Sequence, residues 1–340
     1  MQKNVQQPPF ALSGRFPYRL RSFINLLWAS LATTVRRWVR GPLLPGWSWD
    51  FETSMHFLRA QSAFANRLHK PSEMREFEDS LAFNSPALSQ VAISRIEGPV
   101  KGRWFTPRTG SGNNVILYLH GGGYAFYVRA HDILMALVAL ATHSRLFALD
   151  YRLAPEHAFP AQVEDAQAAY HWLIEQGIAP EQLVVIGDSA GGNLTLSLLL
   201  ALRAANSRLP AAAVCVAPWT DLANPGASMT TNARYDWISK AQADLWASWY
   251  YHQGDVADPM ISPIHAQLSM LPPIYIQVGS AEILYDMIQT FYSQAKAQGA
   301  SIRLDVWEGM THDFQIYGDS LKEAQEALTR IGQFVAEQTT

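Results

Sequence analysis

Residues 183–193 read LVVIGDSAGGN, and this stretch decides the fold. Its four leading apolar residues predict a buried strand, and the run that opens at Ala190 predicts a helix. Between them lies a G-x-S-x-G motif, which turns the chain sharply and exposes its serine at the start of the helix. A phosphate-binding glycine loop is the alternative when the motif is taken alone. The strand before it and the helix after it favour Ser189 as a nucleophile, with Gly187 and Gly191 keeping side chains clear of neighbouring elements.

A second glycine run, HGGGY at residues 120–124, follows another apolar run that predicts a strand. Attack on a carbonyl carbon creates an oxyanion that needs preorganised donors, and consecutive glycines let backbone N–H groups reach it. We expect these donors to be Gly121 and Gly122, together with Ala190 directly after the nucleophile. We expect His120 to orient this loop rather than to act as a base.

The acid and the base of the site are expected in two later loops. In serine hydrolases with such a turn, the acid and then the histidine follow the nucleophile, each after a later strand. Of the three histidines beyond Ser189, only His312 follows the last predicted strand, in the stretch GMTHDF. Glu282 lies just past the preceding strand. Asp286 is the rival acid, but four residues further on it should already lie in the next helix.

Short apolar runs alternate with helical stretches along most of the chain. This alternation predicts the α/β class, with a mostly parallel central sheet that helices cover on both faces. The first two strands, at 91–96 and 100–105, are joined by Glu-Gly-Pro and are expected to pair antiparallel. The other expected strands are 115–119, 146–149, 183–186, 213–217, 274–278 and 302–306, and the expected helices are 131–143, 161–176, 190–204, 282–298 and 320–336.

Two segments fall outside this alternation. Residues 1–90 predict an amphipathic helix, a second helix that Ser48 caps, and a short third helix at 72–82. Residues 222–262 are rich in Trp and Tyr and interrupt the array. We expect both segments to form a helical cap over a catalytic domain that covers 91–340.

The first helix combines an apolar stripe with many arginines. Residues 1–40 hold seven basic and no acidic residues, which leaves −10 for the rest of a chain whose net charge is −3. Its apolar part, residues 23–35, is shorter than the roughly 20 residues of a membrane span and lacks a signal-peptide cleavage site. We expect a helix docked on the protein's own body, and a membrane-surface helix is the alternative. The stripe consists of Leu20, Ile24, Leu27, Leu31, Val35 and Trp38.

The composition limits the other classes of function. Hydrophobic residues make up 49% and charged residues 16%, which suits a globular protein with a sizeable core. A single cysteine, Cys215, excludes an internal disulfide and lies in an apolar run typical of a core. No clustered metal ligands are visible, so we expect no metal and no cofactor. The acidic body argues against nucleic-acid binding, and we expect a cytoplasmic protein.

Taken together, these stretches resemble the bacterial hormone-sensitive lipase family of carboxylesterases. The resemblance covers about residues 95–335 and rests on six stretches in family order. They are HGGGY (120–124), DYRLAPEHAFPA (150–161), GDSAGGN (187–193), APWTDL (217–222), LPPIYIQVGSAEILYD (271–286) and GMTHDF (309–314). The resemblance implies an α/β-hydrolase fold with a helical cap and hydrolysis of short- to medium-chain acyl esters without a cofactor. Glu282 stands where the family more often has Asp, which keeps Asp286 in consideration.

The reaction expected from these residues is a two-step acyl transfer. His312 takes the proton of Ser189 as the hydroxyl attacks the ester, and Glu282 fixes the imidazole tautomer. Water then hydrolyses the acyl-enzyme. We expect Tyr124 and Trp219 to line the substrate pocket. The open alternatives are a lipase acting at lipid surfaces, a non-catalytic ligand-binding protein on the same scaffold, and an acyltransferase or amidase with the same triad. A homodimer is compatible with the family resemblance.

Overall fold

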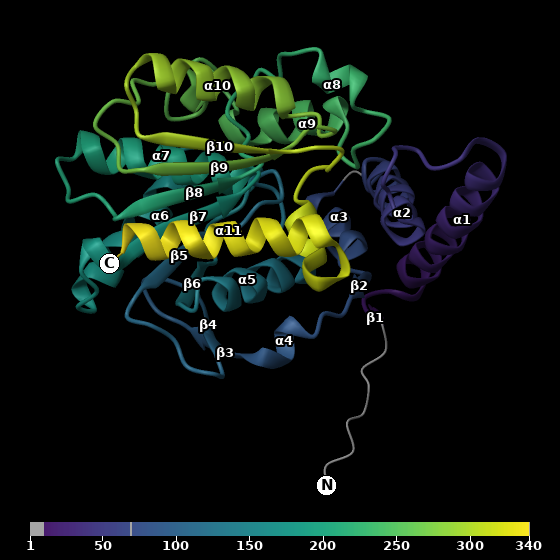
Figure 1. Ribbon diagram of the computed structural model, residues 1–340, viewed down its shortest axis with the longest axis horizontal. Coiled ribbons are helices and arrows are strands. Elements are labelled where there is room, and N and C mark those ends of the chain that lie inside the picture. Colours follow the sequence, from purple (N-terminus) through teal and green to yellow (C-terminus); the bar gives the residue numbers. More distant parts are fainter. Residues whose placement is uncertain (1–9, 69, 340) are drawn as a thin grey trace, which may run out of the picture.

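The centre of the molecule is an eight-stranded sheet, seen in the computed structural model, which describes residues 10–68 and 70–339 (Figure 1). The strand order is β10-β9-β8-β7-β5-β6-β4-β3. β4 pairs antiparallel with β3 and β6, and all other pairs are parallel, which confirms the expected topology. The strands are β3 (Val91–Ile96), β4 (Gly102–Pro107), β5 (Val115–Leu119), β6 (Arg145–Leu149), β7 (Leu183–Asp188), β8 (Ala212–Val216), β9 (Ile274–Gly279) and β10 (Ile302–Trp307).

Helices cover both faces of this sheet, because its strands are apolar on both sides. On β5, for example, Leu117 belongs to the core on one face and Ile116 to the core on the other, and both are fully buried. α5 (Arg129–Ala141) and α11 (Lys322–Gln338) pack on one face, and α6 (Ala161–Glu175), α7 (Ala190–Ala204) and α10 (Tyr285–Ala297) pack on the other. Short 3-10 turns occur at η1 (Pro180–Gln182), η2 (Pro263–His265) and η3 (Phe314–Ser320). Cys215 lies buried in β8, as expected.

The predicted element boundaries in this body differ from the observed ones by at most three residues. The largest difference has a consequence for the site, because α10 begins at Tyr285 rather than at 282. Glu282 therefore lies in the loop after β9, whereas Asp286 lies in the first turn of the helix.

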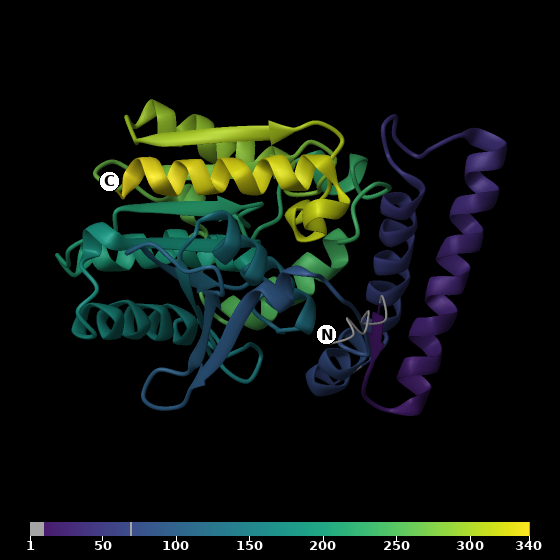
Figure 2. The same ribbon diagram turned by 60° about the horizontal axis from the view of Figure 1, so that its bottom comes forward.

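The N-terminal segment forms a helical hairpin beside one end of the sheet. α1 (Phe16–Arg40) is outermost, and α2 (Trp49–Ala65) lies between it and the body in both views (Figures 1 and 2). Ser48 caps α2 as predicted, accepting the N–H of Phe51 at 3.1 Å. The third helix, α3 (Pro71–Glu78), is shorter than expected, because β2 (Leu81–Phe83) pairs antiparallel with β1 (Phe10–Leu12), a ribbon that the sequence did not reveal. The short helix α4 (Ala87–Gln90) follows. Residues 1–9 of the expected 1–90 segment lie outside the described residues.

α1 is amphipathic, but its orientation is the opposite of the one predicted. Its buried side chains are Ser22, Asn25, Ala29 and Thr33. The apolar stripe faces outward, with exposed fractions from 46% at Leu20 to 88% at Trp38. The helix therefore docks on the protein's own body, as expected, but it does so through its polar side and not through the apolar stripe. Among residues 10–68 and 70–339, no helix is both long enough and apolar enough to cross a membrane.

Candidate active site

The predicted site residues gather at the carboxyl edge of the sheet, where the ends of parallel strands meet. The glycine loop follows β5, Ser189 follows β7, Glu282 follows β9 and His312 follows β10. Residues far apart in the sequence are thereby brought to one edge of the fold.

Ser189 lies at the turn between β7 and α7 in a strained conformation. Its φ of 54° and ψ of −118° are unusual for a residue with a side chain. The Ser189 N–H donates to the Val216 carbonyl at 2.8 Å, which anchors the turn to β8. A Cβ on Gly187 would collide with the Gly191 carbonyl, and one on Gly191 would collide with the Leu119 carbonyl. Both positions therefore require glycine, which agrees with the predicted strand–turn–helix geometry.

Glu282 and His312 form a buried pair. The His312 Nδ1 atom lies 2.9 Å from Glu282 Oε2, and both side chains are almost fully buried. The second carboxylate oxygen, Oε1, accepts the Gly279 N–H at 2.9 Å and so fixes the orientation of the carboxylate. Burial raises the pKa of Glu282, and the hydrogen bond to His312 opposes this shift. A carboxylate held in this way can fix the tautomer of the imidazole.

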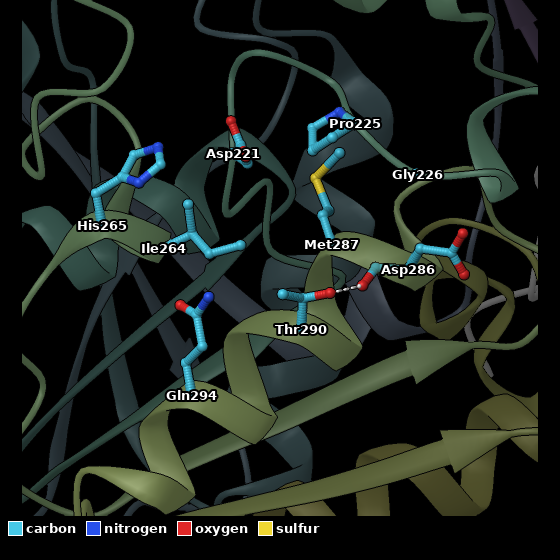
Figure 3. Close-up of a pocket in the computed structure, with 9 residues that line it drawn as sticks. All are labelled: Asp221, Pro225, Gly226, Ile264, His265, Asp286, Met287, Thr290 and Gln294. Atoms are coloured by element: carbon cyan, nitrogen blue, oxygen red, sulfur yellow. Dashed lines mark hydrogen bonds between the residues drawn. The ribbon is translucent and has the colours of Figure 1, made fainter.

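The rival acid, Asp286, points elsewhere. Its carboxylate accepts the Ser228 N–H at 2.8 Å, at the start of the short helix α8 (Ser228–Thr231). Figure 3 shows Asp286 beside Gly226, with Thr290 donating to its backbone carbonyl one turn along α10. These residues line a surface cavity of about 300 Å³, and Ser189, Glu282 and His312 are absent from its lining.

Two further carboxylates surround the histidine. Asp313 Oδ2 lies 3.3 Å from His312 Nε2, and Asp236 Oδ1 accepts the His312 backbone N–H at 3.4 Å. Burial disfavours the imidazolium, but Asp313, Glu282 and Asp236 together raise the pKa of His312 to about 10. Burial also raises the pKa of Asp313 well above its usual range. This environment stabilises the positive imidazolium that forms when a histidine removes a proton from a nucleophile.

Gly121 is already engaged, which corrects one predicted donor. Its N–H donates to Asp188 Oδ2 at 3.0 Å, and Asp188 Oδ1 accepts the Tyr118 hydroxyl at 2.7 Å. His120 Nδ1 lies 2.7 Å from the Gly121 carbonyl, and its ring stacks on Tyr151. Burial lowers the pKa of His120 well below its usual range. The neutral ring therefore supports the loop, as expected, but the Gly121 N–H is not available to an oxyanion.

The next N–H groups in the loop are free. Within residues 10–68 and 70–339, the N–H groups of Gly122 and Gly123 have no hydrogen-bond acceptor. Both glycines have positive φ, and a Cβ would collide with the Phe126 carbonyl at Gly122 and with the Trp246 ring at Gly123. Ala190 is the first residue of α7, a position whose N–H has no acceptor within its helix. These three N–H groups are therefore free to donate, and the one on Ala190 directly follows Ser189 in the chain.

The two predicted pocket residues are both buried in the core of the structure. Tyr124 is fully buried, its hydroxyl donates to Asn193 at 2.5 Å, and its ring stacks on Tyr250. Trp219 is 2% exposed, and its Nε1 donates to Asn224 at 2.7 Å. Ser189 and His312 are almost as buried, at 6% and 2% exposure, so burial alone does not exclude either side chain from an enclosed pocket, and their role as pocket residues stays a prediction.

The expected cap segments reach the histidine loop. Trp47, just before α2, donates through Nε1 to the Gly309 carbonyl at 2.7 Å, and Arg59 of α2 donates to the Asp236 carbonyl at 2.7 Å. Trp237 donates through Nε1 to the His312 carbonyl at 3.1 Å. Residues 222–262, which include α9 (Lys240–Tyr251), and the N-terminal hairpin therefore both contact the loop that carries His312.

Asp188, Asp236 and Asp313 were not among the site residues predicted from the sequence. Asp188 and Asp313 are the chain neighbours of Ser189 and His312 in GDSAGGN and GMTHDF, so their proximity to the site could be predicted from the sequence. Their roles could not. Asp236 lies in the insertion, where no strand precedes it to indicate its position. Within the part of the chain that the structure describes, no cluster of three or more His, Cys, Asp or Glu side chains is suited to hold a metal ion.

Comparison with known proteins agrees with this fold. Residues 116–316 match the family model described as alpha/beta hydrolase fold. An acetyl-hydrolase of Streptomyces hygroscopicus is 40% identical over 240 residues, which cover 70% of this chain and 80% of the relative. An esterase of Acinetobacter venetianus is 30% identical over 295 residues, which cover 85% of this chain and 97% of the relative.

A solved structure extends the likeness to the whole fold. A crystal structure of an esterase from the bacterial hormone-sensitive lipase family superposes with a TM-score of 0.73 at 32% identity, covering 96% of this chain and 100% of that one. The chain is a carboxylic ester hydrolase and belongs to the bacterial hormone-sensitive lipase family of α/β-hydrolase carboxylesterases.

Proposed function

We infer that this esterase hydrolyses short- to medium-chain acyl esters with Ser189 as nucleophile, His312 as general base and Glu282 as the acid that orients it. The observation that carries the proposal is the buried hydrogen bond of 2.9 Å between His312 Nδ1 and Glu282 Oε2. With Nδ1 bound to a carboxylate, Nε2 is left to accept a proton. His312 Nε2 makes no hydrogen bond among the described residues, although Asp313 Oδ2 lies 3.3 Å from it, and a catalytic base can engage its nucleophile only when substrate is bound.

The reaction proceeds through an acyl-enzyme. The Ser189 oxygen attacks the ester carbonyl while His312 takes its proton, and the alcohol leaves with that proton. Water then attacks the acyl-enzyme with the same base, which releases the acid. The free N–H groups of Gly122, Gly123 and Ala190 are the oxyanion donors in this proposal, and Gly123 replaces the Gly121 expected from the sequence.

The preference for short acyl chains is supported by the surroundings of the site. The N-terminal hairpin and residues 222–262 together form the cap, because both contact the loop that carries His312. Residues 222–262 are rich in Trp and Tyr, and bulky side chains over the site leave little room for a long acyl chain. The Streptomyces hygroscopicus relative, named for acetyl hydrolysis, agrees with a small acyl group.

The proposal is tested with p-nitrophenyl esters from acetate to palmitate, using wild type, Ser189→Ala and Ser293→Ala. Ser293 is an exposed serine of α10 and serves as the matched control. We expect turnover that peaks at short acyl chains, is lost in Ser189→Ala and is unchanged in Ser293→Ala. A peak at long chains that depends on Ser189 would indicate a lipase, and turnover that survives Ser189→Ala would refute the assigned nucleophile.

A further inference from the structure

The most unusual surface of the molecule is the outward side of α1. Leu20, Ile24, Leu27, Leu31, Val35 and Trp38, here named the α1 apolar face, are each between 46% and 88% exposed. They recur at helical spacing along a helix of 25 residues, about 37 Å long. Trp28 adds a further exposed ring beside them. Contiguous apolar surface of this extent marks an interaction site.

This orientation is fixed by polar contacts on the opposite side of the helix. Asn25 Nδ2 donates to Gln61 Oε1 of α2 at 2.7 Å, and Ser22 bonds both Gln61 and Ser80. Thr33 Oγ1 lies 2.8 Å from His56 Nδ1. Turning the α1 apolar face inward would leave these buried groups without partners, which is unfavourable. The face is therefore presented to the surroundings by the fold itself.

The charges on α1 indicate which kind of surface would bind the α1 apolar face. Arg36 and Arg37 pair with the buried Glu52, and Arg21 lies over the Phe64 ring of α2. Within residues 10–68 and 70–339 no carboxylate pairs with Arg19 or Arg40. The sequence has no acidic residue before Asp50. An apolar strip on a helix that has unpaired arginines near its two ends complements an anionic lipid surface, where basic side chains meet phosphates and Trp favours the interface.

A second copy of the chain fits this surface less well. Two α1 helices packed antiparallel about a two-fold axis would bring the arginines near one end of α1 close to those near the other end in the second copy. With no acid before Asp50, α1 supplies no opposite charge to such an interface. Like charges across an interface are unfavourable.

We propose that α1 docks on the surface of a bilayer that contains anionic phospholipid, with its axis in the membrane plane and the α1 apolar face in the acyl boundary. This docking is independent of the catalytic roles proposed above. α2 packs on the inner side of α1, and Trp47, just before α2, donates a hydrogen bond to the His312 loop. The docked molecule therefore holds its cap close to the lipid.

The test is co-flotation of the full chain with vesicles of phosphatidylcholine alone or mixed with phosphatidylglycerol. We expect wild type to float with the mixed vesicles and to bind pure phosphatidylcholine much more weakly. The double variant Leu27→Asp/Leu31→Asp should lose binding at least tenfold. Met270→Asp, at a site 83% exposed in the loop before β9, is the matched control and should bind like wild type. Replacing Arg19 and Arg40 by Gln should weaken binding roughly fivefold per residue.

Two further measurements separate the outcomes. Hydrolysis of p-nitrophenyl acetate without vesicles should be equal in wild type and Leu27→Asp/Leu31→Asp, which shows that the variant is folded and that loss of binding is not loss of the catalytic site. Analytical ultracentrifugation reports the oligomeric state. The proposal would be overturned if wild type does not float with the mixed vesicles, or if the two aspartates leave flotation unchanged. It would also be overturned if the chain does not float and instead forms a dimer that the two aspartates dissociate.

Discussion

Replacing Glu282 by Gln tests the assignment of the acid, because Gln is nearly isosteric with Glu. The amide oxygen of Gln can still accept the Gly279 N–H, which Glu282 Oε1 accepts at 2.9 Å. The amide NH₂ then faces His312 Nδ1, where the carboxylate oxygen lies at 2.9 Å in the wild type. An NH₂ donor favours the tautomer protonated at Nε2, and that tautomer cannot take the proton of Ser189.

The expected magnitude follows from losing both the tautomer and the charge. The corresponding acid-to-amide change in serine proteases lowers kcat about 10⁴-fold, so we expect a loss of about 10³- to 10⁴-fold in kcat/KM, or roughly 4–5.5 kcal/mol of transition-state stabilisation. The assay is steady-state hydrolysis of p-nitrophenyl acetate, with a thermal melt to show that the variant is folded. Asp286→Asn is the control and should remain near wild-type activity, because Asp286 bonds Ser228 and not His312. A folded Glu282→Gln enzyme with wild-type activity, or inactivation by Asp286→Asn alone, would refute the reasoning.

Three other predictions follow from the same contacts. Gly123→Ala should lower kcat about 10²- to 10³-fold, because its Cβ would collide with Trp246 and displace a proposed oxyanion donor; a steady-state rate close to wild type would remove Gly123 from that role. Asp313→Asn removes a carboxylate 3.3 Å from His312 and should lower its pKa, so the rising limb of kcat/KM against pH should move to lower pH, and an unmoved limb would contradict the electrostatic account. Ser48→Ala should lower the free energy of unfolding in urea by about 1 kcal/mol, whereas Ser48→Thr should largely keep the cap.

The catalytic edge of the fold was predictable because its residues follow strands that the sequence displays clearly. Ser189, Glu282 and His312 each come after a short apolar run, and parallel strands bring their carboxyl ends to one edge. The choice among the glycine donors was not predictable in this way. It depends on the bond from the Gly121 N–H to Asp188, and the two residues are 67 positions apart. The burial of Tyr124 and Trp219 was not predictable either, because aromatic residues beside a motif pack in the core as readily as they line a pocket.

The orientation of α1 shows what a hydrophobic period leaves undecided. The period locates the stripe on the helix, but the partner helix decides which side faces inward. α2 presents Gln61 and His56 to α1, and these side chains bond Ser22, Asn25 and Thr33, so the polar side of α1 is the one that α2 can satisfy. Each large apolar side chain left in water forgoes roughly 1.5–3 kcal/mol of burial energy. The α1 hairpin therefore has a lower free energy when another apolar phase covers the α1 apolar face. The proposed anionic lipid surface would supply that phase, and its phosphates would supply the negative partners that Arg19 and Arg40 lack.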